Sequence, residues 1–100
     1  MNNIKLISIS EILVKPHCRR SKAMLHRDIK NKTFVSPVHP GGDESHKSFY
    51  PEHEVDALLA ARIAGYSDKQ MKELVIKLEQ QRHEVLAGLL SKIEKLVSTI

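Results

Sequence analysis

Apolar residues recur at helical spacing along much of the chain, and the first such stretch begins with a helix-start pattern. Ser8 stands three residues before Glu11, an arrangement in which each side chain satisfies a free backbone amide at a helix N-terminus. A first helix is therefore expected over about residues 9–15. Pro16 would stop it, because proline cannot continue the hydrogen-bond pattern.

A second short helix is expected after a basic turn. Ser21 can cap it, Leu25 and Ile29 form its buried stripe four residues apart, and it should end near Asn31. Such a helix is about 15 Å long and too short to be stable alone, so a few contacts must anchor it while its basic side faces outward. Two short helices joined by a tight turn predict a helix-turn-helix.

The next segment alternates β-prone residues with turn formers. Residues 33–38, TFVSPV, favour a strand that Pro37 confines to a sheet edge, and residues 48–51, SFYP, favour a returning strand. Between them lies a turn-rich loop, HPGGDESHK. A hairpin of this kind beside a helix-turn-helix is a wing, so the predicted fold is mostly α with a small β-hairpin wing: a winged helix-turn-helix plus a long C-terminal helix.

A third helix is expected from Pro51, which can occupy its first position. Glu52 and Glu54 would lie in its first turn, where the helix dipole favours acidic residues, and Gly65 would end it. The apolar residues at helical spacing should complete the core; they are Val55, Leu58, Leu59 and Ile63.

A long helix of about residues 68–98 closes the chain, with the capping pattern repeated at Ser67 and Gln70. Two apolar stripes run along it, separated by residues 79–84, EQQRHE, which include no apolar residue. A polar interruption of this kind indicates a change of packing partner. The first stripe is expected to dock on the N-terminal domain and consists of Met71, Leu74, Val75 and Leu78.

The second stripe is expected to serve self-association. Leu86, Leu90, Ile93, Val97 and Ile100 are spaced four, three, four and three residues apart, as in a coiled coil, and so many apolar residues would not stay exposed on a small monomer. The alternative is that this half folds back over its own domain. The predicted oligomerisation residues are Leu86, Leu89, Leu90, Ile93, Leu96 and Val97.

Charge is distributed unevenly along the 100 residues. Residues 1–50 carry nine Lys and Arg against four acids, a net +5, whereas residues 51–100 carry seven against eight, a net −1. This asymmetry favours a polyanionic partner for the first half. The expected organisation is a winged helix-turn-helix DNA-binding domain over residues 1–66 and a long self-associating helix over residues 67–100.

Other features bear on location and chemistry. Cys18 is the single cysteine and no long apolar run is present, so we expect a cytoplasmic protein with no membrane span. The six His residues lack the paired spacing of zinc ligands, and neither a GxSxG nucleophile motif nor a GKS or GKT phosphate loop occurs. The sequence predicts no enzyme, no metal site and no cofactor.

A DNA-binding surface accounts for more residues than any catalytic arrangement. A recognition helix enters the major groove through its N-terminal residues, and a wing loop reaches the backbone or the minor groove. The predicted DNA contacts are Arg19, Arg20, Ser21, Lys22, Ala23, His26, Arg27, Lys30, His39, His46 and Lys47.

Two motifs, SKAMLHRDIKNKTFVSPV and FYPEHEVDALLAARIAG, resemble those of the AlpA-like phage and genomic-island regulators, which are excisionase-type, MerR-related winged helix-turn-helix proteins. The matching residues are Ser21, Leu25, Arg27, Ile29, Lys30, Phe34, Pro37, Val38, Glu54, Val55, Asp56, Ala57, Ala60, Ala61 and Arg62. The resemblance implies a bacterial, nucleoid-associated protein that binds double-stranded DNA as a homodimer or higher oligomer. It further implies an excisionase or a transcriptional regulator of an integrase gene, with an integrase as a further partner.

The chain departs from the family pattern at several positions. Ala23, Met24 and His26 stand where the family usually has Ser, Thr and Tyr, which implies a different DNA target, and Lys32 replaces a usual Gly after the recognition helix. A second reading stays open in which the protein is an interaction adaptor that works through its C-terminal helix without specific DNA binding.

Overall fold

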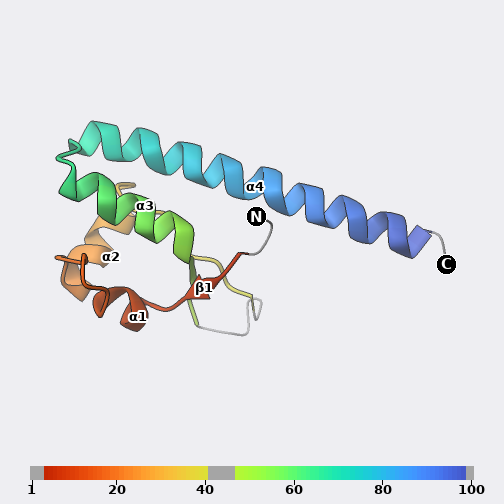
Figure 1. Ribbon diagram of the computed structural model, residues 1–100, viewed down its shortest axis with the longest axis horizontal. Helices are drawn as coiled ribbons and strands as arrows, with labels where there is room; N and C mark the ends of the chain where they lie inside the picture. Colours follow the sequence, from red (N-terminus) through yellow and green to blue (C-terminus); the bar gives the residue numbers. More distant parts are fainter. Residues whose placement is uncertain (1–3, 41–46, 99–100) are drawn as a thin grey trace.

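The computed structural model describes residues 4–40 and 47–98 and shows a mostly helical molecule (Figure 1). Four helices are present among these residues: α1 (Ile9–Leu13), α2 (Lys22–Lys30), α3 (Glu52–Ile63) and α4 (Asp68–Ser98). The strands β1 (Leu6–Ile7) and β2 (Tyr50–Pro51) form a small antiparallel sheet. The rod of α4 packs along α3 with its first half, and its second half projects beyond the rest of the molecule (Figure 1).

The predicted starts of three helices are confirmed by their caps. At α1 the Glu11 amide donates to Ser8 Oγ and the Ser8 amide donates to Glu11 Oε1, which completes the capping box. Ser21 Oγ accepts from the Met24 amide at the start of α2, and Ser67 and Gln70 make the reciprocal pair at α4. Helix α1 is shorter than predicted: it ends at Leu13, whereas the predicted helix ended near residue 15.

The N-terminal segment forms a strand that local periodicity did not predict. Leu6 pairs with Pro51 and Ile7 with Tyr50 in antiparallel register. As a result Pro51 lies in β2 and at the N-cap of α3, instead of occupying the first helical position as predicted. The predicted hairpin between residues 33–38 and 48–51 is smaller than expected, because residues 50–51 pair with β1 instead. In the described residues on either side of segment 41–46, it consists of an isolated bridge between Val38 and Phe49.

Among the described residues, the core is one cluster to which the four helices and both strands contribute. Phe34 and Tyr50 meet edge to face within it, with ring centroids 5.9 Å apart. Ile63 was expected in this core, but its side chain is 65% exposed. Arg62, seven residues after Val55, occupies that face of α3 instead, and the helix ends one residue later. The buried apolar residues are Ile7, Ile12, Leu25, Phe34, Val35, Tyr50, Val55, Leu58, Leu59, Ala61, Met71, Val75 and Leu78.

Helix α4 docks through its first apolar stripe, as predicted. Met71, Val75 and Leu78 are buried and Leu74 packs against the same cluster from its edge. The core therefore continues past residue 67, where the domain boundary was expected.

The polar interruption after this stripe contains one partner of a buried ion pair, Arg82, whose other partner is Glu54 of α3. Arg82 Nε donates to Glu54 Oε2 at 2.9 Å and Arg82 Nη2 donates to Glu54 Oε1, with the Glu54 side chain wholly buried. A buried charge that loses its partner costs several kcal/mol, so this pair holds α4 in one register on α3.

Two helices end in the same backbone motif with different residues at its left-handed position. After α2, the Thr33 amide donates to Asp28 O and the Lys32 amide to Ile29 O; after α3, the Tyr66 amide donates to Ala61 O and the Gly65 amide to Arg62 O. Both are Schellman motifs, which favour glycine at the residue with positive φ. Gly65 meets that preference with φ 89°, whereas Lys32 adopts φ 65° against it.

We expect Lys32→Gly to stabilise the protein by about 0.5–1 kcal/mol, because it relieves the left-handed strain at a partial cost in unfolded-state entropy. Lys32→Ala should leave stability unchanged, since alanine keeps the strain. Gly65→Ala should destabilise by about 1 kcal/mol. Urea unfolding of the three variants checks this; a Lys32→Gly protein no more stable than Lys32→Ala would contradict it.

Candidate nucleic-acid interface

Helix α2 has one face in the core and one in solvent, as its sparse apolar content predicts. Leu25 is fully buried, Ile29 packs at the edge of the core and Met24 is half-buried. The exposed face is formed by predicted DNA contacts, which are Lys22, Ala23, His26, Arg27 and Lys30. The structure thus places these five residues together on the outer side of one helix.

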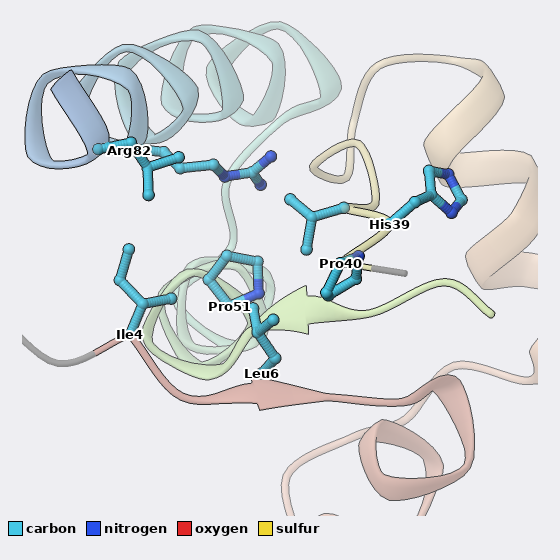
Figure 2. Close-up of a pocket in the computed structure, with 8 residues that line it drawn as sticks. Ile4, Leu6, His39, Pro40, Pro51 and Arg82 are labelled. Carbon is cyan, nitrogen blue, oxygen red and sulfur yellow. The ribbon is translucent and has the colours of Figure 1, made fainter. Parts of the chain in front are cut away.

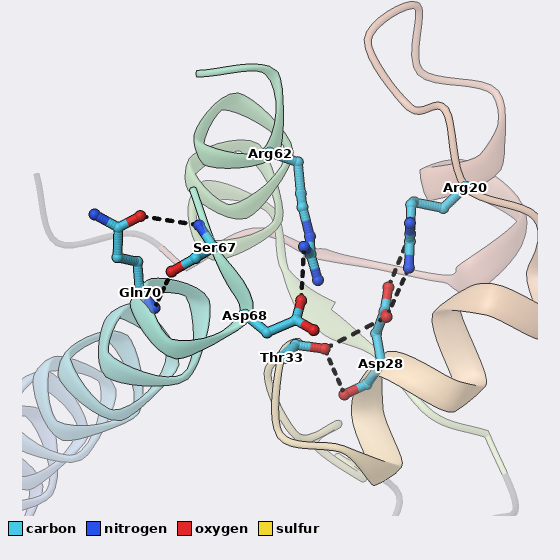
Figure 3. A network of polar contacts seen from close by, with 7 residues as sticks. All are labelled: Arg20, Asp28, Thr33, Arg62, Ser67, Asp68 and Gln70. Atoms are coloured by element: carbon cyan, nitrogen blue, oxygen red, sulfur yellow. Dashed lines mark hydrogen bonds and ion pairs between the residues drawn. The ribbon is translucent and has the colours of Figure 1, made fainter. Parts of the chain in front are cut away.

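The acidic residue of this helix, Asp28, faces inward and joins three segments of the chain. Arg20 donates to both of its carboxylate oxygens, from Nε at 3.0 Å and from Nη2 at 2.8 Å (Figure 3). Thr33 Oγ1 approaches Asp28 Oδ1 at 3.4 Å and the Asp28 carbonyl at 3.3 Å. This network attaches α2 to the turn before it and to the segment after it.

The network changes the role of Arg20 among the predicted contacts. Two of the N–H groups of its guanidinium bind Asp28, so Arg20 positions α2, and only its remaining N–H groups are left for a phosphate. Sequence reasoning missed Asp28 because no periodicity relates residues 20 and 28. The single signal was an acid within an otherwise basic helix.

The other predicted contacts are spread over the surface. Arg19 is exposed in the turn before α2, and Ser21 is exposed but uses its hydroxyl oxygen to cap that helix. His39 and Lys47 are exposed and joined by a contact of 3.2 Å between His39 Nδ1 and the Lys47 carbonyl oxygen. His46 lies outside the described residues. The structure therefore groups the α2 residues with each other and joins His39 to Lys47 outside that helix.

Acidic partners neutralise the basic side chains near α1. Lys15 Nζ lies 3.0 Å from Glu52 Oε2 and 3.1 Å from Asp56 Oδ1, and His17 Nε2 lies 3.3 Å from Asp56 Oδ1. The hydrogen bonds to Glu52 and then Asp56 raise the pKa of Lys15, because both carboxylates favour its charged form. These contacts connect the segment after α1 to α3, so Lys15 is not free for an outside anion.

A polar hollow flanks α2 on the side of Arg27. Its volume is about 360 Å³, and α2, α3 and the start of α4 wall it. Arg62 reaches into this region from α3 and pairs with Asp68 of α4 at 3.0 Å (Figure 3). The residues that line the hollow are Arg20, Arg27, Asp28, Asn31, Thr33, Arg62, Asp68 and Lys72. Arg62, Asp68 and Lys72 were not among the predicted contacts.

An apolar groove of about 270 Å³ lies at another part of the molecule, where α4 passes β1 and β2 (Figure 2). It is lined by Ile4, Leu6, Val38, His39, Pro40, Pro51, Arg82 and Leu86. Leu86 also begins the second stripe of α4, so the groove adjoins the projecting half of that helix.

The second stripe of α4 is exposed along its described length. The exposed fractions of its side chains range from 36% at Leu89 to 68% at Leu96. The helix continues without a break through Gly88, and the alternative of a tail folded back over its own domain is not what the structure shows. Ile100 lies outside the described residues. The exposed members include every predicted oligomerisation residue, namely Leu86, Leu89, Leu90, Ile93, Leu96 and Val97.

Within residues 4–40 and 47–98, no cluster of three or more His, Cys, Asp or Glu is arranged to hold a metal ion. No helix in the same ranges has both the length and the apolar character needed to cross a bilayer.

Comparisons with protein-family models, with curated proteins and with solved structures found no match to this chain. The likeness to AlpA-like regulators rests on the two sequence motifs.

Proposed function

We propose that this protein is a sequence-specific DNA-binding protein of a mobile element that acts as an excisionase, as a transcriptional regulator of an integrase gene, or as both. The observation that carries the proposal is the unneutralised basic face of α2. Lys22, Arg27 and Lys30 are exposed and have no acidic partner within the described part of the chain. Arg20, Arg62 and Arg82, by contrast, each pair with a carboxylate.

The proposed binding mode is that of a winged helix-turn-helix, in which α1 and α2 are the two helices and α2 is the recognition helix. Its N-terminal residues Lys22, Ala23 and His26 would meet base edges, where the Ala23 methyl suits a thymine methyl group. Arg27 and Lys30 can bind either guanine edges or phosphates. The segment around His39 and Lys47 would act as a wing on the backbone or in a minor groove, with His46 as a further contact.

The second part of the proposal is self-association. A second copy of the chain would pack against the second stripe of α4. Residues 83–98 extend about 24 Å beyond the docked part of α4 at 1.5 Å per residue, and the stripe follows heptad spacing over this length. Two such helices side by side would cover apolar side chains that one copy leaves in water. A dimer, or a row of protomers on repeated sites, would then present several α2 helices to one DNA segment, where an integrase could also bind.

DNA binding is checked by fluorescence anisotropy on duplexes tiled across the genomic region that surrounds the gene. We expect one or more duplexes to bind with an affinity that falls steeply with salt, and Arg27→Ala to weaken that binding by more than about tenfold. Lys77→Ala is the control, because Lys77 is an exposed cation of α4 remote in sequence from α2. Equal losses in the two variants would contradict a role for the α2 face.

Self-association is checked by sedimentation velocity at tens of micromolar protein. We expect the wild type to be a dimer or larger and Leu90→Glu to be a monomer, because a charge would be buried in the helix interface. Ile76→Glu is the matched control: Ile76 is also on α4 and is 57% exposed, as is Leu90, but it lies outside the stripe. A monomeric wild type would contradict self-association through the stripe. It would favour the adaptor hypothesis, in which another protein covers the stripe.

A further inference from the structure

The polar hollow beside α2 holds more positive than negative charge. Four cationic side chains line it, Arg20, Arg27, Arg62 and Lys72, against the two carboxylates of Asp28 and Asp68. Both carboxylates are engaged: Asp28 binds Arg20 through two hydrogen bonds, and Asp68 binds Arg62 at 3.0 Å.

Two cations of the hollow are left over after this pairing. Arg27 and Lys72 are exposed and lack an ion-pair partner among residues 4–40 and 47–98. They come from different elements, α2 and α4, and line the same hollow. An anion that enters would meet these two free charges, together with guanidinium N–H groups of Arg20 and Arg62 that their carboxylates do not use.

The hollow lies where a DNA backbone would pass beside a bound recognition helix. Arg27 and Asn31, the C-cap residue of α2, are four residues apart, so they lie on the same side of the helix end, and both line the hollow. A helix that lies in the major groove has a sugar-phosphate backbone along each flank. The flank of Arg27 and Asn31 would therefore bring phosphates to the mouth of the hollow.

We propose that this hollow is a phosphate-binding subsite in which Arg27 and Lys72 are the direct ligands. Arg20 and Arg62 would contribute the guanidinium N–H groups that their carboxylates do not use. Its ligand is a phosphodiester group of duplex DNA, an assignment that rests on the proposed function. The start of α4 is then part of the DNA interface as well as of the core. Asp68, 75% exposed at its side chain, opposes the phosphate and keeps Arg62 partly occupied in the absence of DNA.

The test measures duplex affinity over a range of salt concentrations for Lys72→Ala, Asp68→Asn and Lys77→Ala. Lys72→Ala should weaken binding by about three- to tenfold and lower the slope of log K against log salt by about 0.9, the value for one lost phosphate contact. Asp68→Asn should tighten binding by about two- to fivefold, as expected for removal of one exposed repulsive charge. Lys77→Ala, the loss of another exposed lysine of the same helix, should change neither quantity.

The outcomes separate this subsite from the proposed function. If Arg27→Ala weakens duplex binding while Lys72→Ala leaves affinity and salt slope unchanged, the subsite is wrong and the DNA-binding function stands. If the wild type binds no duplex, the function is wrong, and titration with inorganic phosphate decides the subsite. Amide shifts around Lys72 that saturate in the wild type and vanish in Lys72→Ala would keep it as a site for a small phosphate, and their absence would overturn it.

Discussion

The orientation of α2 depends on Asp28, because a helix of nine residues cannot hold itself in place. Leu25 and, at the edge of the core, Ile29 provide the apolar anchor, but apolar contacts alone do not fix the rotation and tilt of the helix. The Asp28 carboxylate removes that freedom by binding Arg20 in the turn before α2 and Thr33 in the segment after it. With those contacts made, the side of α2 that carries Lys22, His26 and Arg27 can point only outward.

A small number of contacts also holds the long helix α4 in place. The first half of α4 packs on the core through Met71, Val75 and Leu78, and the second half projects from it (Figure 1). The Glu54–Arg82 pair lies where that packing ends, so it anchors α4 at the last point before the helix projects into solvent. Because the projecting half is fixed in direction, its apolar stripe is available to a second copy without any rearrangement of the core.

Much of the fold was predictable because its signals are local. The caps at Ser8, Ser21 and Ser67 and the apolar periodicity after them predict the helices to within a few residues. The pairing of Leu6–Ile7 with Tyr50–Pro51 was not predictable, since two-residue strands have no period and their partners lie far apart in the sequence. Arg82 was hidden for a related reason: within EQQRHE it looks like solvated polar surface, and its partner lies 28 residues away.

The candidate interface also has a part that the sequence predicted and a part that it did not. The exposed face of α2 follows from the position of Leu25 and Ile29, whereas the hollow beside it requires Arg27, Arg62 and Lys72 to meet, and only the folded chain brings these residues together. Lys32 was not predictable in this way: the sequence shows its unusual place after α2 but not its left-handed backbone, which the structure shows with φ 65°.

DNA binding by this protein is proposed to depend on the outer face of α2. Hydroxyl-radical footprinting of the genomic region around the gene, combined with a measurement of DNA bending on the protected fragments, tests it most directly. Discrete protected sites are expected: several phased sites with a large bend for an excisionase, or a single promoter site for a transcriptional regulator. Uniform cleavage across the whole region, at protein concentrations that coat DNA non-specifically, would contradict it.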